Sequence, residues 1–260
     1  DAREALTRAI ALEPSNQDIR QYRRTLADRM TRWRAGADYT VEHISDLDDP
    51  WTELQLSVAT QTRAGSFGVR AYDATRFGAD DQQIEIEAYP RLREGTSMYA
   101  AAAFADGSSL YPKRRFAADV YQMLGRGFEG TLGLRRLEFG EPTHVYVAAL
   151  GKYAGDYLWQ ARAFHTPGET DSLTWQIGGR RYLADGVSYA GLRYGRGTWR
   201  GELRDLADLD RLNADSGVAD LSLARGRVTI AGSIGISREE RELRDARWQT
   251  SLSTGVRIRF

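Results

Sequence analysis

The sequence ends on Trp248-Gln-Thr-Ser-Leu-Ser-Thr-Gly-Val-Arg-Ile-Arg-Phe260, in which apolar and polar residues alternate over most of the stretch. Successive side chains of a β-strand point to opposite faces, so the stretch predicts a strand with one apolar and one polar face. Its length exceeds the common strand length of about 5–6 residues. It suits a tilted strand that crosses a membrane, which needs about 9–11 residues.

The composition excludes several classes of protein. The 260 residues include 36 basic and 36 acidic side chains, and the balanced charge gives no reason to expect nucleic acid as a partner. There is no cysteine, which excludes disulfides and thiolate sites. The longest apolar run, Met98–Ala105, is far shorter than the roughly 18–20 residues of a membrane-spanning helix. The length of an apolar run does not exclude membrane-spanning strands, because only alternate residues of a transmembrane strand face lipid.

Residues 1–36 have a different pattern from the rest, and we expect a helical segment there. Apolar residues recur at helical spacing up to Pro14, and a second helix with an apolar stripe reaching Trp33 follows. The first helix resembles the second helix of a tetratricopeptide repeat. Because one such repeat cannot bury its apolar face alone, we expect further repeats upstream, with a plain helical hairpin as the alternative.

After Gly36 the period changes to two, and we predict that residues 37–260 form a β-barrel of fourteen strands, with twelve or sixteen as alternatives. The predicted strands are Asp38–Ser45, Trp51–Thr62, Ser66–Thr75, Gln82–Leu92, Thr96–Ala105, Arg114–Leu124, Phe128–Phe139, Thr143–Lys152, Asp156–His165, Asp171–Leu183, Val187–Trp199, Ser216–Leu223, Arg227–Arg238 and Ala246–Phe260.

The connections between these strands alternate in length. Short connections that end in glycine, such as Arg63–Gly65 and Ala184–Gly186, alternate with longer ones such as Arg76–Asp81 and Arg200–Asp215. Tight hairpins need the positive φ that glycine supplies. Short turns on one rim and longer loops on the other are typical of a closed, antiparallel, up-and-down barrel in the bacterial outer membrane, with both chain ends on the periplasmic rim.

Three runs carry a resemblance to a known family: Asp48–Leu54, Tyr72–Gln83 and Glu87–Arg91. They resemble the YaiO-type outer-membrane β-barrel family, and the terminal Thr254–Phe260 fits as well. The resemblance implies a barrel in the outer membrane. It also implies a role in the export of an extracellular polysaccharide, by analogy with other export proteins that join helical repeats to a barrel.

The polar parity of each strand predicts which side chains line the lumen, since an arginine or lysine that faces lipid at mid-depth costs about 2–4 kcal/mol. Opposite charges could pair and fill the lumen, or they could line a hydrated passage suited to a neutral or zwitterionic glycan. The predicted lining residues are Glu53, Arg70, Tyr72, Glu85, Glu87, Asp119, Glu129, Arg135, Arg162, Arg180, Arg193, Arg257 and Arg259.

Leucines at three-residue spacing in the connection Arg200–Asp215 predict a short amphipathic helix, either a gate folded into the mouth or a cap on the rim. These leucines are Leu203, Leu206, Leu209 and Leu212. Aromatic residues near the predicted strand ends favour interfacial girdles over ordinary cross-strand packing. The girdle residues are Trp51, Tyr89, Tyr111, Phe128, Phe139, Tyr153, Tyr157, Trp199, Trp248 and Phe260.

We therefore predict an export conduit, with a plugged structural or receptor barrel (for phage or another ligand) as the alternative. An enzyme at the rim that uses His144 or His165 is a third hypothesis, but no catalytic residue, metal site or cofactor is assigned. The expected partners are outer-membrane lipid and lipopolysaccharide, a polysaccharide, and periplasmic or inner-membrane synthase components.

Overall fold

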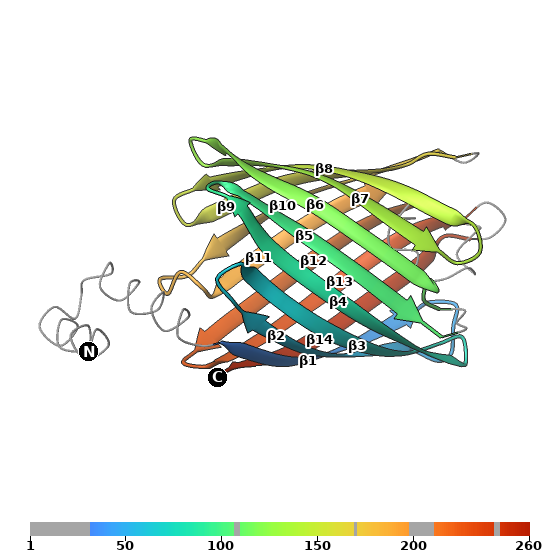
Figure 1. The fold of residues 1–260 in the computed structure, drawn as a ribbon. Helices are drawn as coiled ribbons and strands as arrows, with labels where there is room; N and C mark the ends of the chain where they lie inside the picture. Colours follow the sequence, from blue (N-terminus) through green and yellow to red (C-terminus); the bar gives the residue numbers. More distant parts are fainter. Residues whose placement is uncertain (1–31, 107–109, 169–170, 198–210, 242–244) are drawn as a thin grey trace, which may run out of the picture.

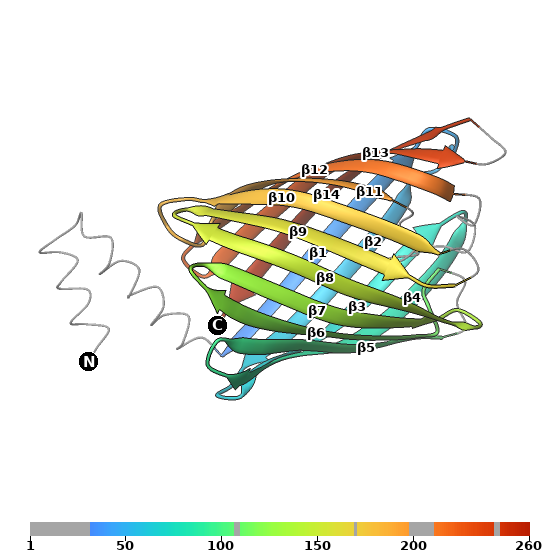
Figure 2. The same cartoon turned by 90° about the horizontal axis from the view of Figure 1, so that it is seen from above.

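The computed structural model describes residues 32–106, 110–168, 171–197, 211–241 and 245–260. They form one closed barrel of fourteen antiparallel strands, each paired with its neighbours in the sequence (Figures 1 and 2). The strands are β1 (Trp33–Ile44), β2 (Trp51–Gln61), β3 (Gly65–Arg76), β4 (Ala79–Arg93), β5 (Thr96–Ala105), β6 (Arg114–Gly125), β7 (Phe128–Glu138), β8 (Pro142–Ala154), β9 (Tyr157–Thr166), β10 (Ser172–Tyr182), β11 (Tyr189–Gly197), β12 (Arg211–Arg225), β13 (Val228–Arg241) and β14 (Arg247–Arg259).

The first and last strands close the barrel. β1 pairs with β14 from Arg34 opposite Arg259 to Ile44 opposite Gln249. At the end of this ladder, Trp33 and Phe260 exchange two backbone hydrogen bonds of 3.0 Å. Closure leaves no strand edge unpaired, as a hydrocarbon environment requires. The predicted count of fourteen strands is confirmed, and the terminal stretch is the strand that closes the barrel.

The two faces of the barrel wall have opposite chemistry. On β4, the Glu85 side chain is fully buried, whereas Ile84 and Ile86 on either side are each 57% exposed. Bulky apolar side chains are exposed in the same way on the other strands, for example Leu192, Ile234 and Leu252. We call the face with the exposed apolar residues outward and the other face inward. An apolar outer surface with charges inside is the pattern of a barrel embedded in lipid.

Short turns lie on the rim that also holds the C-terminus (Figure 1). On the opposite rim, the expected longer loop Arg76–Asp81 is instead a two-residue turn between β3 and β4. Phe77 and Gly78 have φ values of 52° and 72°. Two consecutive residues with positive φ make the turn that best matches the twist of a hairpin. The strands therefore continue through residues that were assigned to a loop.

Two further boundaries correct the sequence-based expectations. β1 begins at Trp33 rather than Asp38, so Trp33 belongs to a strand and not to the expected helix. β12 begins at Arg211 rather than Ser216, which places Leu212 in a strand. Leu203, Leu206 and Leu209 lie outside the described residues, as does the expected helical segment up to residue 31. In the described ranges, no helix is long and apolar enough to span a membrane.

Candidate passage through the barrel

Most inward charges at the centre of β2–β7 are paired with one another, and we call this part of the barrel the ion-paired wall. Its centre is Glu85, which accepts a hydrogen bond from Arg70 Nη1 at 3.3 Å and forms an ion pair with Arg115 through the other carboxylate oxygen. The Tyr72 hydroxyl lies 3.4 Å from Glu85 Oε1. A fully buried carboxylate is stable only when such partners replace water.

A small residue makes the central ion pair possible. Glu85 lies opposite Ala103 on β5, and Ala103 lies opposite Arg115 on β6. Arg115 therefore reaches Glu85 across a whole strand. Ala103 has no exposed surface, because the two long side chains cover it. The inward alanines of β5 thus provide the space in which charges from its two neighbours meet.

Two further ion pairs extend the ion-paired wall. Arg70 Nη2 lies 2.6 Å from Glu87. Arg135 binds both oxygens of Asp119, through Nη1 and Nη2 at 2.6 Å each. Such a bidentate pair is among the stronger charge-assisted hydrogen bonds. These contacts fix the inward side chains of β3 to β7 against the wall.

Leu110 and Tyr111, which precede β6, fold into the barrel near the long-loop rim. Asp81 accepts hydrogen bonds from the backbone N–H groups of Leu110 and Tyr111 at 3.1 and 2.9 Å. The Tyr111 hydroxyl donates to Glu53 Oε2 at 3.0 Å, and Leu110 packs against Ala74. This inserted segment narrows the lumen over the ion-paired wall, and it is a feature that the sequence analysis missed.

Four residues assigned to the aromatic girdle in fact face inward: Trp51, Tyr89, Tyr111 and Tyr153. Trp199 lies outside the described residues. Trp51 is only 3% exposed and Tyr111 only 8%. The guanidinium of Arg76 lies 5.4 Å from the centre of the Trp51 ring, and Arg76 also pairs with Glu53 at 3.2 Å. Trp51 and Tyr111 therefore belong to the polar packing at the narrowed mouth. Position near a strand end does not distinguish them from residues that face lipid.

The inward faces of β9–β14, which we call the open wall, carry many small residues, and their one fully buried carboxylate in the described residues is Glu239, paired with Arg247 at 2.7 Å. Their small inward residues are Gly178, Gly191, Gly195, Ser216, Ser233, Gly235, Ser251, Ser253 and Gly255. Arg193 is exposed, and the side chain of Arg180 is 42% exposed. Because these residues face the inside of a closed barrel, their exposure means that water reaches the lumen along the open wall.

The remaining predicted lining residues also occupy inward positions, but they do not join the cluster around Glu85. Arg257 pairs with Asp38 at 2.8 Å, and Arg259 donates to the Gly226 carbonyl at 3.2 Å. Arg180 Nε lies 3.8 Å from Asp220. Glu129, Arg162 and Arg193 form no ion pair within the described residues. The thirteen predicted side chains therefore divide between two walls.

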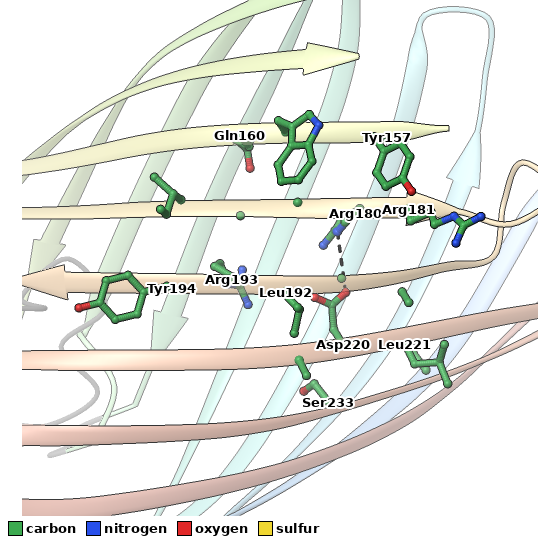
Figure 3. A pocket seen from close by; sticks show the side chains of 18 of the residues that line it. Tyr157, Gln160, Arg180, Arg181, Leu192, Arg193, Tyr194, Asp220, Leu221 and Ser233 are labelled. Carbon is green, nitrogen blue, oxygen red and sulfur yellow. Dashed lines mark ion pairs between the residues drawn. The ribbon is translucent and has the colours of Figure 1, made fainter. Parts of the chain in front are cut away.

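A hollow of about 1350 Å³ lies along β7–β14, and inward residues of the open wall such as Arg180, Arg193 and Ser233 belong to its lining. Most side chains around it face outward, among them Trp159, Leu192 and Leu252, and small outward residues such as Gly179 form its floor. Figure 3 shows outward Leu192 next to inward Arg193, together with the ion pair between Arg180 and Asp220.

The two histidines considered for catalysis lie on the outward face at the long-loop rim. His165 Nε2 is 2.7 Å from Asp171 Oδ1, but the two side chains are 48% and 69% exposed. His144 lies opposite Arg136 on β7. Such solvated positions lack the low-dielectric surroundings that tune acid–base groups. Within the described residues, no group of three or more acidic or histidine side chains could hold a metal ion.

Comparisons with known proteins agree with this architecture. The family model of the YaiO membrane β-barrel domain matches residues 33–199. Among curated proteins, none matches the sequence.

Similar solved structures include the CymD monoaromatic hydrocarbon channel, with 8% identity, a TM-score of 0.63, and coverage of 91% of this chain and 90% of that one. The Acinetobacter baumannii outer membrane protein Omp33 has 9% identity and a TM-score of 0.55, covering 88% and 99%. A bacterial polysaccharide outer membrane secretin has 5% identity and a TM-score of 0.53, covering 88% and 99%. At these identities the likeness shows the fold alone.

Proposed function

Because the chain belongs to the YaiO membrane β-barrel domain family, we propose that it is an outer-membrane channel that conducts a secreted sugar polymer along its open wall. The observation that carries the proposal is the exposure of Arg193 and Arg180 inside a closed barrel. A lumen filled by its own side chains would bury these arginines against acidic partners. Instead, water reaches them.

The chemistry of the open wall suits a sugar. Hydroxyls of Ser233, Ser251 and Ser253 alternate with outward residues along β13 and β14, and Gln160 and Gln176 lie inward on β9 and β10. Hydroxyls and amides can both donate and accept hydrogen bonds, as sugar hydroxyls do. Small side chains leave a broad path, so a hydrated polymer can exchange one set of hydrogen bonds for the next without tight binding.

Aromatic rings stand where a polymer would enter from the short-turn rim. The rings of Tyr182 and Tyr189 meet edge to face with centroids 5.9 Å apart, and Arg180 lies over the Tyr189 ring at 4.4 Å. Flat apolar faces of this kind can stack on pyranose rings. The chain before Trp33 joins the barrel at this same rim, which is where a periplasmic partner, such as a component of the synthase, would hand over the polymer.

The inserted segment favours a second candidate, a structural or receptor barrel without transport. Leu110 and Tyr111 are buried inside the barrel and held by Asp81. If this segment and the ion-paired wall close the lumen, the surface loops alone would carry the function.

Conductance of the purified full-length protein in a planar lipid bilayer separates the two candidates. We expect stepwise currents that maltooligosaccharides block transiently, and a larger conductance in Asp81→Ala, which releases the inserted segment. Asp80→Ala is the matched control, because Asp80 is exposed and, among the described residues, its carboxylate accepts a hydrogen bond only from the Thr75 hydroxyl at 2.6 Å. A barrel that stays electrically silent, also as Asp81→Ala, would contradict transport and support the receptor.

A further inference from the structure

We infer that the open wall selects for anions and that its substrate is an acidic sugar polymer, an inference that rests on the proposed channel function. Three inward arginines carry it: Arg162 on β9, Arg180 on β10 and Arg193 on β11. No inward acid lies on β9, β10 or β11, so these three strands present positive charge alone to the lumen.

The strand register arranges the three arginines in steps along the lumen. Arg162 lies opposite Gln176, and Arg193 lies opposite Gly178, two residues further along β10. Arg180 itself is the next inward residue of β10. Inward residues of one strand are about 7 Å apart. The positions of Gln176, Gly178 and Arg180 on β10 define three successive levels along the lumen, and each level holds one arginine. We call the three arginines the column, and a passing polymer would meet them one after another.

The charge of this column is not neutralised by neighbours. Neither Arg162 nor Arg193 forms an ion pair in the described part of the chain, and the Nε of Arg162 makes no hydrogen bond there. Only Arg180 has an acid nearby, with Asp220 at 3.8 Å. Glu129 lies at the same level as Arg193 but four strands away, on β7.

Glycines next to the column keep room for the arginine side chains. A Cβ added at Gly178 would lie 3.3 Å from Cβ of Arg193, and one at Gly191 would lie 3.1 Å from Cγ of Arg180. A larger residue at either glycine would crowd the aliphatic part of the arginine side chain beside it. The arginine heads can therefore reach into the water of the lumen.

Guanidinium groups in a row favour a polymer of carboxylates over a neutral one. Arginine remains charged at all relevant pH values and can bind a carboxylate through two parallel hydrogen bonds. Three weak contacts in steps of about 7 Å let an acidic chain advance from one group to the next. A polymer of uronic acids has this chemistry, whereas a neutral or zwitterionic glycan would gain little from the column.

The test is the reversal potential of the full-length protein in a planar bilayer under a KCl gradient. We expect chloride to permeate better than potassium, and Arg162→Gln combined with Arg193→Gln to lower that preference about fourfold, or about twofold per charge. The preference of the unchanged protein should also fall at 1 M salt, where the Debye length is about 3 Å. Arg181→Gln is the matched control, because Arg181 faces outward next to Arg180 and should leave selectivity unchanged.

Sugar oligomers then identify the substrate class. Oligoglucuronate should block the current at lower concentration than maltooligosaccharides of equal length, and the double variant should lose this difference. A conducting barrel whose selectivity is the same in the double variant would overturn the inference and leave the channel intact. A barrel that conducts nothing would overturn the channel itself and the inference with it.

Discussion

The ion-paired wall and the open wall belong to one barrel, yet small inward residues have opposite effects on the two walls. On the ion-paired wall, Ala103 lies between Glu85 and Arg115, and the opposite charges meet over it. On the open wall, Gly178 lies between Gln160 and Arg193, and no acid is there to meet the arginine. The space above a small residue is filled when its neighbours attract each other, and it stays open to water when they do not.

This difference gives the two walls separate tasks. The ion-paired wall holds β2–β7 together and anchors the inserted segment through Asp81 and Glu53. The open wall keeps Arg180 and Arg193 in water, where a solute can reach them. Substitutions on the first wall should therefore act on stability, and substitutions on the second should act on permeation.

The largest expected effect is the loss of the central carboxylate. Glu85→Ala should lower the free energy of unfolding by about 3 kcal/mol, because removing one partner of a buried ion pair leaves the other charge uncompensated. Arg70 and Arg115 are 26% and 32% exposed, which keeps the cost at the lower end of the usual range. Urea unfolding in phospholipid vesicles, followed by tryptophan fluorescence, measures it. Glu94→Ala in the exposed turn after β4 is the control, and equal costs for both variants would contradict the account.

The second-largest expected effect on stability comes from a charge placed on the outward face of the open wall, compared with the same charge on its inward face. Ile234→Arg puts a cation against lipid near the middle of β13 and should cost about 2–3 kcal/mol. Ser233→Arg places the same side chain in the water of the lumen, where we expect little loss of stability and a smaller conductance. The same unfolding assay compares the two variants. If they lost equal stability, the assignment of inward and outward faces on this wall would be wrong.

A smaller effect should follow from filling the space above β5. Ala103→Leu would displace Arg115 from Glu85, and overpacking of this kind costs about 1–3 kcal/mol. The neighbouring Ala102→Leu adds the same side chain on the outward face and should leave stability unchanged or slightly higher. Unfolding of this pair in the same vesicles tests whether the ion pair depends on the alanine. If Ala103→Leu left the free energy of unfolding unchanged, the ion pair between Arg115 and Glu85 would not depend on the space above Ala103.

The sequence was sufficient for the parts of the fold that depend on local alternation. Most strands alternate polar and apolar residues, and glycines mark tight turns, so the barrel and its fourteen strands could be predicted. The predicted strand boundaries were wrong where a turn or a residue at the rim has no distinctive composition. Phe77–Gly78 makes a two-residue turn within a polar run, and Trp33 extends a strand although its apolar neighbours occur at helical spacing.

The arrangement inside the barrel was harder to predict, because it depends on register between strands. Alternation assigns Glu85 and Arg115 to polar faces, but only the pairing of β4, β5 and β6 shows that Ala103 brings them together. The inward position of Trp51 and the inserted Tyr111 depend on contacts with Arg76, Asp81 and Glu53. No local pattern in the sequence encodes those contacts.

Single cysteines test the difference between the two walls most directly, since the native chain has none. The variants Ser233→Cys on the open wall and Ala103→Cys on the ion-paired wall would be refolded in vesicles and treated with a membrane-impermeant, anionic methanethiosulfonate. Our account predicts rapid modification at position 233, and protection at position 103 until the protein is unfolded. Equal rates at the two positions, or protection at position 233, would contradict it.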